Sequence, residues 1–369
     1  MTTDPTARAG AILEIDLGAI VANWRKLAGR AAPALCAAVV KAGAYGLGAA
    51  PVARALAAAG CRMFFVATLD EGIALRQTVG KAPEIAVLNG PFPGTAPEFT
   101  EYGLIPVLNE PGQIAEWRRL GGRPAAILHV DTGMARLGLS AREFITLIEN
   151  PPPIAWRVVM SHLACADEPD HAMNERQRTR FAAAAVRLPG VAASLAASSG
   201  IFLGPDYHFD IVRPGAALYG VNPQPGRPNP LRPVVRLSGK ILQIRQIDSG
   251  ESVGYGAAHV MQAPGRAAVV ALGYADGWLR SLSHRGCGYL AGMRVPLLGR
   301  VSMDLVTFDV TAIPPALARP GVTIELLGSD YGVDDAAADA GTIGYEILTA
   351  LGSRYHRVYR DPPDVASSE

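Results

Sequence analysis

The sequence predicts an α/β protein of two domains, an N-terminal (β/α)8 TIM barrel followed by a C-terminal domain of mostly antiparallel strands. Three observations support this fold class. Short apolar runs alternate with helical segments from residue 12 to about 220, a proline-rich stretch follows, and the remaining sequence is β-like with frequent glycines. We therefore expect residues 12–228 to form the barrel and residues 229–369 to form the β domain.

The apolar runs in the first part have the length of buried strands. Runs of four to eight apolar residues separated by helices are typical of parallel strands covered on both faces. So many βα units in so few residues favour a closed barrel over an open sheet. The expected strands lie in residues 11–17, 34–40, 62–68, 84–89, 104–109, 125–130, 154–161, 191–198 and 209–215, and the expected helices are 18–30, 49–59, 70–79, 111–120, 141–149 and 173–187.

The stretch "NPQPGRPNPLRP" (222–233) marks a linker, because its prolines can neither continue a helix nor pair within a central strand. Beyond it, apolar runs punctuated by glycine indicate a smaller β domain. The runs occupy residues 234–247, 267–275, 287–299, 305–310 and 322–328.

Composition excludes several classes of protein. The chain has 369 residues, 18% of them charged, and a net charge of +1, which gives no electrostatic bias toward nucleic acid or an anionic membrane. The longest apolar runs are too short to span a bilayer, and the N-terminus predicts no signal peptide. Four separated cysteines match no metal motif, so we expect no metal and a cytoplasmic protein whose thiols are reduced. They are Cys36, Cys61, Cys165 and Cys287.

Lys41 ends the apolar run 34–40 and precedes the glycine-rich "AGAYGLG". Barrel enzymes keep their active sites at the C-terminal ends of the strands. Burial there should lower the pKa of the amine, and a neutral amine is what Schiff-base chemistry requires. The alternative is a structural lysine paired with a carboxylate of the barrel.

Three further segments each have a functional and a structural interpretation. "VDTGMARLG" places Arg136 after a strand, where it could also belong to a helix-capping turn. "FDIVRPGAALYG" places Arg213 at a strand end, and the N–H groups of Gly215 and Ala216 could bind a phosphate. "ESVGYGAAHV" places Tyr255 between two glycines, which is also the pattern of a hairpin tip.

Taken in order along the chain, these segments resemble the alanine racemase family of pyridoxal-phosphate enzymes (fold type III). The resemblance rests on "VVKAGAYGLG", "VDTGMARLG", "SHLACADE", "AASSG", "VRPGAALYG", "VGYGAAHV", "GYADGWLR" and "GRVSMD". It implies that the protein interconverts L- and D-alanine, supplying D-alanine for peptidoglycan. It also implies a barrel joined to a β domain, and a homodimer with shared active sites.

Residue by residue, the resemblance implies two catalytic bases, with Lys41 also forming the Schiff base and Tyr255 serving as the second base. Arg213 would face the pyridine nitrogen and form a hydrogen bond with His162, whereas Arg136 and Met303 would lie near the substrate carboxylate. The phosphate would be held by Tyr45, Ser199, Gly215 and Ala216.

These residue types suit racemisation. The α-proton must leave one face and return to the other, so two acid/base groups are needed on opposite faces. The pKa values of lysine and tyrosine are ordinarily about 10, and both must be lowered. Arg213 is a donor that does not lose its proton, which weakens the electron sink and should limit transamination and decarboxylation.

Two departures from the family pattern affect the surroundings of the bases. Many members have a carbamylated lysine that positions the arginine at position 136, and this chain has His129 there. A tyrosine that contacts the phosphate in some members aligns with Ser353.

Three rival functions are a broad-specificity racemase acting on serine or other small amino acids, a barrel-type decarboxylase and a non-catalytic pyridoxal-phosphate carrier. Decarboxylases generally use a carboxylate at the ring nitrogen and a cysteine-containing motif in the β domain, so Arg213 and "VGYG" disfavour the second. Carriers resemble the barrel alone, and the β domain with its candidate base disfavours the third.

Overall fold

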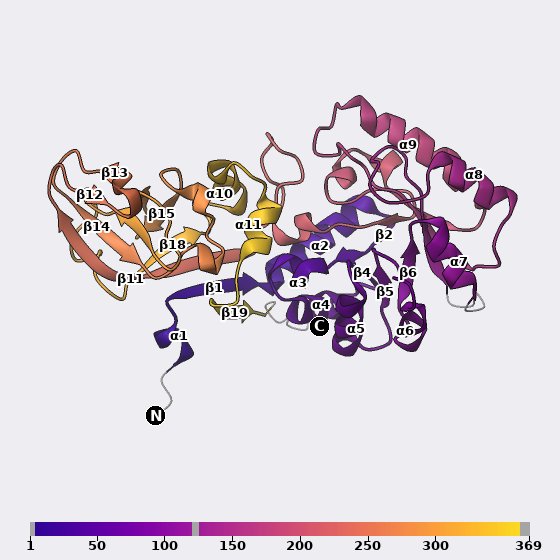
Figure 1. The fold of residues 1–369 in the computed structure, drawn as a ribbon, viewed down its shortest axis with the longest axis horizontal. Helices are drawn as coiled ribbons and strands as arrows, with labels where there is room; N and C mark the ends of the chain where they lie inside the picture. The colour runs from indigo at the N-terminus through magenta and orange to yellow at the C-terminus, as the bar shows by residue number, and fades with distance from the viewer. Residues whose placement is uncertain (1–3, 120–124, 362–369) are drawn as a thin grey trace, which may run out of the picture. The chain divides into compact units, whose positions relative to one another are not determined.

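The computed structural model describes residues 4–119 and 125–361, which divide into two compact units. Residues 20–119 and 125–232 form one unit, and residues 4–19 and 233–361 form the other. The first is the predicted barrel and the second is the predicted β domain (Figure 1). No helix in the described ranges is both long and apolar enough to cross a membrane.

The barrel is built on a parallel sheet in the order β3-β4-β5-β6-β7-β8-β9. Strand β10 pairs in parallel with β2, and an Ala197–Arg213 bridge links the end of β9 to the end of β10. Because β2 leads directly into β3, these pairings close the barrel, as predicted. The strands are β2 (Leu35–Cys36), β3 (Ala38–Val39), β4 (Met63–Val66), β5 (Glu84–Val87), β6 (Ile105–Leu108), β7 (Ala126–His129), β8 (Trp156–Met160), β9 (Ala192–Ser194) and β10 (Ile211–Val212).

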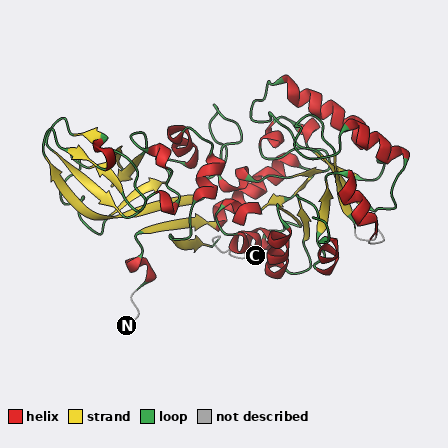
Figure 2. Cartoon of the chain, viewed as in Figure 1, coloured by secondary structure: helices red, strands yellow, loops and turns green. Residues whose placement is uncertain are grey.

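The strands are buried on both faces, as the continuous apolar runs predict. All four residues of β4 are buried, and Phe64 and Phe65 point to opposite faces of the same strand. Helices lie outside the strands (Figure 2). They are α2 (Leu17–Ala31), α3 (Lys41–Tyr45), α4 (Ala49–Ala58), α5 (Leu69–Val79), α6 (Ala96–Glu101), α7 (Pro111–Arg119), α8 (Ala141–Glu149) and α9 (Ala172–Ala185), with the short 3-10 helices η1 (Ser199–Phe202), η2 (Pro205–Tyr207) and η3 (Ala216–Tyr219).

Capping residues account for where two of the predicted helices begin. The hydroxyl of Thr68 accepts a hydrogen bond from the Glu71 N–H at the start of α5, and Ser140 does the same for Glu143 at the start of α8. The six predicted helices are confirmed to within two residues at each described end, and Leu120, the predicted last residue of 111–120, lies outside the described residues.

The β domain is a curled sheet in the order β14-β17-β16-β15-β18-β11-β1-β19, in which β14 also pairs with β11. The 13-residue β11 pairs through its first half with β1 and β18 and through its second half with β14, which curls the sheet back on itself. The strands are β1 (Ala11–Asp16), β11 (Val235–Ile247), β12 (Ser252–Val253), β13 (His259–Val260), β14 (Gly265–Val270), β15 (Cys287–Leu290), β16 (Met293–Leu298), β17 (Val306–Asp309), β18 (Thr323–Leu327) and β19 (His356–Arg360).

Strand β1 corrects the interpretation of residues 11–17 as a barrel strand. It pairs antiparallel with β11 and parallel with β19, so it belongs to the β domain although it precedes the barrel in the chain. Its burial alternates along the strand, which is the pattern of a sheet with one covered face. The barrel unit ends at Arg232, four residues after the end predicted for the barrel.

Short helices complete the β domain and were not expected from the sequence. They are α10 (Val333–Ala340) and α11 (Gly344–Ala350), with η4 (Tyr255–Ala257), η5 (Tyr274–Asp276) and η6 (Arg280–Leu282), and a further short helix α1 (Pro5–Arg8) precedes β1.

Candidate active site

Lys41 lies where β3 ends and the chain turns sharply. The next four residues, Ala42 to Tyr45, all have positive φ, so this segment is a left-handed turn rather than an ordinary helix. Glu71 fixes the turn, because its carboxylate accepts hydrogen bonds from the N–H groups of Ala42 (2.5 Å) and Ala67 (2.8 Å). The side chain of Lys41 therefore projects from a fixed backbone.

The electrostatic surroundings of Lys41 favour the neutral amine. Burial lowers its pKa, Arg136 lowers it further, and Glu71 acts in the opposite sense. Lys41 forms no ion pair with any of the described residues. The alternative of a structural lysine paired with a barrel carboxylate therefore finds no support.

Arg213 is a buried cation at the end of β10, with only 3% of its surface exposed. Its guanidinium donates hydrogen bonds to the Ser194 hydroxyl and to the Ser161 carbonyl (2.7 Å). Within the described residues it has no carboxylate partner, and burial lowers its pKa to about 10. A group with that pKa is still protonated at pH 7, so Arg213 presents a positive hydrogen-bond donor inside the barrel.

Two histidines near Arg213 are held neutral. Burial, followed by the positive charge of Arg213, lowers the pKa of His129 to about 4 and that of His162 to about 3. The hydrogen bond expected between His162 and Arg213 is not among those formed by the described residues. His162 is coupled to Arg213 through charge only.

His129 has a defined orientation and tautomer. Its Nδ1 lies 2.7 Å from Oδ1 of Asn109. The amide nitrogen of Asn109 donates to the carbonyls of Leu88 and Val107, each at 3.0 Å, so its oxygen must face the ring. Nδ1 of His129 is therefore the protonated nitrogen, and Nε2 carries the lone pair.

The turn after β10 packs closely against Tyr45 and leaves one backbone N–H group unused within the described residues. A Cβ at Gly215 would lie 2.3 Å from the hydroxyl oxygen of Tyr45, so only glycine fits against this buried tyrosine. The N–H of Ala216 donates to no acceptor in the described part of the protein, which leaves it available to an anion.

Ser198 organises this turn. Its buried hydroxyl accepts hydrogen bonds from the N–H groups of Gly215 (3.0 Å) and Ala217 (3.1 Å). The N–H of Gly215, predicted to bind phosphate, is thus directed at Ser198. The hydroxyl of the neighbouring Ser199, which is partly exposed, contacts no hydrogen-bonding partner among the described residues.

Arg136 is exposed on a loop shaped by Asp131. The Asp131 carboxylate accepts hydrogen bonds from the N–H groups of Gly133 and Met134, each at 2.9 Å, and of Ala135 at 3.1 Å. Arg136 itself forms no ion pair or hydrogen bond within the described ranges. Its positive charge lowers the pKa values of Lys41 and His162, so it lies close enough to both to act electrostatically.

The barrel thus brings together the residues that the sequence placed at strand ends. Mutual electrostatic effects connect Lys41, Arg136, His162 and Arg213, and van der Waals contact connects Tyr45 with Gly215. Sequence reasoning missed the supporting roles of Ser198, Asn109 and Glu71. The paired serines of "AASSG" signalled the first, whereas the other two depend on contacts between different βα units.

The β domain presents Tyr255 and Met303 on exposed turns. Tyr255 opens η4, between the paired strands β12 and β13, and 72% of its surface is exposed. Tyr255 therefore lies at a hairpin tip, as the alternative interpretation of "ESVGYGAAHV" predicts, and its side chain is accessible. Met303 is 53% exposed, and its carbonyl accepts a hydrogen bond from the Ala275 N–H (3.0 Å) beside Tyr274.

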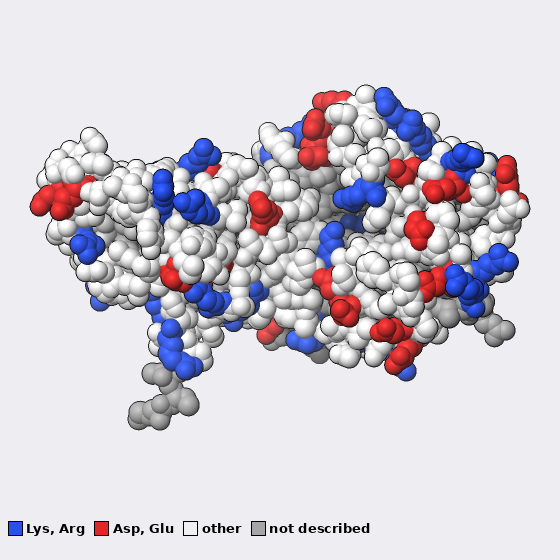
Figure 3. All heavy atoms as spheres, viewed as in Figure 1, with Lys and Arg blue, Asp and Glu red and all other residues white. Residues whose placement is uncertain are grey.

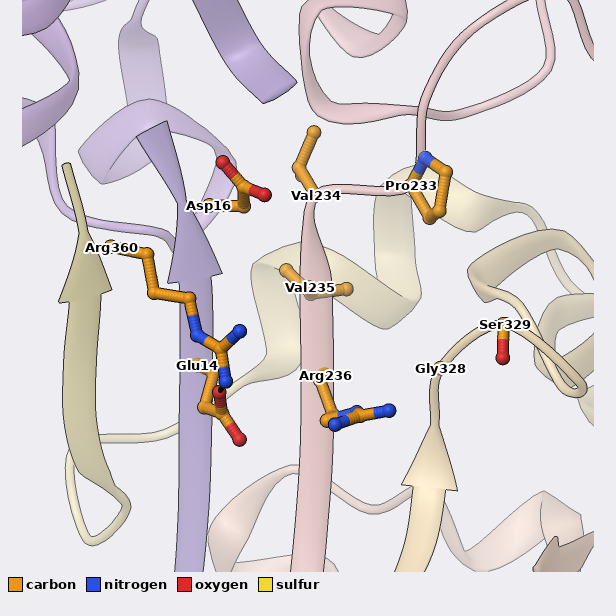
Figure 4. A pocket seen from close by; sticks show the side chains of 9 residues that line it. All are labelled: Glu14, Asp16, Pro233, Val234, Val235, Arg236, Gly328, Ser329 and Arg360. Carbon is orange, nitrogen blue, oxygen red and sulfur yellow. Dashed lines mark hydrogen bonds and ion pairs between the residues drawn. The ribbon is translucent and has the colours of Figure 1, made fainter. Parts of the chain in front are cut away.

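A pocket of about 240 Å³ in the β domain contains none of the predicted site residues (Figure 4). Its two arginines are already paired, Arg360 with Glu14 and Arg236 with Glu325. The lining residues are Glu14, Asp16, Pro233, Val234, Val235, Arg236, Gly328, Ser329 and Arg360.

On the face shown in Figure 3, acidic and basic side chains are interspersed rather than segregated. The described residues contain no group of three or more His, Cys, Asp or Glu side chains that could hold a metal ion. All four cysteines are free thiols, and Cys165 is the one that is not fully buried.

The protein is a closed barrel joined to a β domain. Beyond the same ends of the barrel strands lie a lysine, an available backbone N–H and a buried arginine that has no carboxylate partner among the described residues. Together these features define a barrel-type pyridoxal-phosphate enzyme. Comparison with known families is consistent with that class. Residues 15–223 match the model of the alanine racemase N-terminal domain, and residues 234–359 match that of the alanine racemase C-terminal domain.

The chain belongs to the alanine racemase family. It is 55% identical to an alanine racemase of Rhodospirillum rubrum, over 95% of this chain and 96% of that protein. It is 52% identical to a protein of Mesorhizobium japonicum named as a catabolic alanine racemase, over 96% and 94% of the two chains. The crystal structure of alanine racemase from Bartonella henselae, described with covalently bound pyridoxal phosphate, is 42% identical, with a TM-score of 0.92 over 95% of this chain and all of that one.

Proposed function

We propose that this protein interconverts L- and D-alanine with pyridoxal phosphate, using Lys41 and Tyr255 as its two bases. The observation that carries the proposal is Lys41 itself, an amine at a barrel strand end whose pKa is lowered by burial and which has no ion-pair partner in the described structure. Membership of the alanine racemase family supports the choice of substrate.

The barrel residues fit the cofactor. Lys41 Nζ would be its covalent attachment point, and Arg213 would donate to the pyridine nitrogen. The hydroxyls of Tyr45 and Ser199, together with the N–H of Ala216, would hold the phosphate, while Gly215 allows the backbone to approach closely. When bound, pyridoxal phosphate supplies an electron sink that makes the α-proton of an amino acid acidic.

The side chains of this protein would then exchange protons on the two faces of the substrate. Lys41 Nζ would accept the α-proton of D-alanine while Tyr255 Oη donates a proton to the opposite face, and the two residues would exchange these roles for L-alanine. Arg136, whose guanidinium makes no ion pair with the described residues, would bind the substrate carboxylate near Met303. A charged donor at Arg213 that keeps its proton moderates the electron sink and favours simple proton return.

We further propose a homodimer in which the β domain of one subunit completes the barrel site of the other. The exposure of Tyr255, Tyr274 and Met303 on turns of the β domain supports this arrangement, since large apolar side chains are exposed on interaction surfaces. A two-fold dimer would contain two equivalent sites. We place the protein in the cytoplasm, where its four free thiols would remain reduced, and assign its D-alanine to peptidoglycan.

Turnover of separate amino acids in deuterated water tests this function. The protein loaded with pyridoxal phosphate should incorporate deuterium at the α-carbon of L-alanine and release D-alanine, with much less turnover of L-serine or L-lysine. Equal turnover of all three amino acids would show that the protein is a broad-specificity racemase and not an alanine racemase. Failure to rescue growth of a D-alanine-requiring bacterium would contradict the peptidoglycan role.

A further inference from the structure

The loop that carries Met303 is tied to the turn that carries Tyr274. The N–H groups of Tyr274 and Ala275 donate to the carbonyls of Ser302 and Met303, each at 3.0 Å. A Cβ at Gly273 would lie 2.2 Å from the Ser302 oxygen, so the two backbones are in direct contact. The position of Met303 therefore depends on how this turn is held.

Arg354 links both segments from a third part of the domain. Its Nε and Nη2 each donate to one carboxylate oxygen of Asp276, both at 2.7 Å. Its Nη1 donates to Asp304, the residue next to Met303, also at 2.7 Å. We call Asp276, Arg354 and Asp304 the carboxylate clamp.

The two sides of the clamp differ in their surroundings. Asp276 is buried, and its carboxylate also accepts the Gly273 N–H (2.8 Å), so this side shapes the Tyr274 turn. The side chain of Asp304 is 57% exposed, so this side only restrains the Met303 loop. Arginine suits the position because its planar guanidinium can donate two hydrogen bonds to one carboxylate and a third to a second carboxylate. A lysine ammonium cannot reproduce this geometry.

We propose that Arg354 is a positioning residue of this enzyme, which fixes the Met303 loop against the Tyr274 turn through the carboxylate clamp. The consequence for turnover rests on the proposed function, in which Met303 lies near the substrate carboxylate. If the loop is released, substrate binding should weaken more than the chemical step, because no acid/base group has moved.

Asp304→Asn is the sharpest variant, because it removes the negative charge through which Arg354 restrains the loop and leaves the buried Asp276–Arg354 pair intact. Removing Arg354 entirely would leave a buried carboxylate without its cation and could prevent folding. Arg354→Lys serves as the second variant. Glu175→Gln is the matched control, since Glu175 forms a comparably exposed ion pair (2.6 Å, 60% exposed) with Arg178 on α9 of the barrel.

Amide hydrogen exchange of the holoenzyme measures the clamp without reference to activity. In Asp304→Asn, the peptide containing Tyr274 and Ala275 should exchange about two- to fivefold faster than in the wild type, because these amides donate to the loop that Asp304 restrains. Glu175→Gln should leave that peptide unchanged. Exchange at the wild-type rate in Asp304→Asn would overturn the clamp.

Kinetics with L-alanine measure its role in the reaction. Asp304→Asn should raise KM about three- to tenfold with kcat within about twofold of the wild type. The effects of Asp304→Asn and Arg354→Lys on kcat/KM should not add, because both act on the same loop. Additive effects, or faster exchange with an unchanged KM, would overturn the positioning role. A wild-type protein that fails to racemise alanine would count against the proposed function alone, since the exchange result would still decide whether the clamp exists.

Discussion

Ser198→Ala should destabilise the protein even without cofactor. Ser198 is 4% exposed, and its hydroxyl accepts hydrogen bonds from two backbone N–H groups, those of Gly215 and Ala217. A buried donor left without a partner costs about 1–3 kcal/mol. Because the substitution leaves both N–H groups without their shared acceptor, it should lower the free energy of unfolding by about 2–4 kcal/mol. Relaxation of the turn would also displace the Ala216 N–H and weaken cofactor binding about tenfold, or about 1.4 kcal/mol.

Ser199→Ala provides the matched comparison in the same segment. The Ser199 hydroxyl has no protein partner in the described structure, so its removal should change the free energy of unfolding by less than about 0.5 kcal/mol. It should still weaken cofactor binding, because this hydroxyl is assigned to the phosphate. Urea unfolding of the apoprotein and absorbance titration with pyridoxal phosphate measure the two quantities. Unchanged apoprotein stability in Ser198→Ala, or an equal loss in both variants, would refute the assignment.

Four further predictions concern the proposed bases and His129. Lys41→Ala should lose the visible absorbance band of the bound cofactor and nearly all racemisation, and a variant that keeps both would exclude Lys41 as the attachment point. His129 should make the enzyme insensitive to bicarbonate at fixed pH, since no amine is present there to be carbamylated; a rate increase with a carbamate detected by mass near Arg136 would contradict this. Because the pKa of His129 falls from 6.5 to about 4 on folding, the unfolded state binds more protons between these values, and stability should fall by up to about 3 kcal/mol as the pH falls through this window. His129→Gln should make that part of the stability profile less steep and leave the contribution of His162, whose pKa is also lowered, whereas an unchanged profile would show that His129 does not contribute to it. Tyr255→Phe should suppress single-turnover loss of α-deuterium from L-alanine much more than from D-alanine, whereas equal suppression would assign Tyr255 a different role.

The sequence predicted the barrel well because its strands are continuous apolar runs and its helices are long. Residues such as Phe64 and Phe65 can only be buried on both faces, and that pattern is local. The interpretation of residues 11–17 as a barrel strand was wrong because an isolated strand of six residues shows its burial pattern but not its partners. Pairing of β1 with β11 joins segments more than 200 residues apart, and nothing local specifies it.

In the candidate site, too, features set by local sequence could be predicted and features set by distant contacts could not. Lys41 and Arg213 could be singled out because each follows an apolar strand and precedes a turn. Two features could not be predicted, because they depend on contacts between segments distant in the chain: the orientation of His129 by the Asn109 amide, and the carboxylate clamp around Arg354. The direction of the Gly215 N–H toward Ser198 likewise depends on side-chain geometry, which a motif does not specify.

The measurement that tests the central claim most directly is the activity of a mixed dimer. Lys41→Ala and Tyr255→Phe homodimers should each be nearly inactive. The heterodimer of the two, co-expressed with different tags and purified, should contain one site with both bases and one with neither. If each site draws Lys41 from one subunit and Tyr255 from the other, it should recover roughly half of the wild-type rate per dimer. A purified heterodimer no more active than its parents would contradict sites shared between subunits.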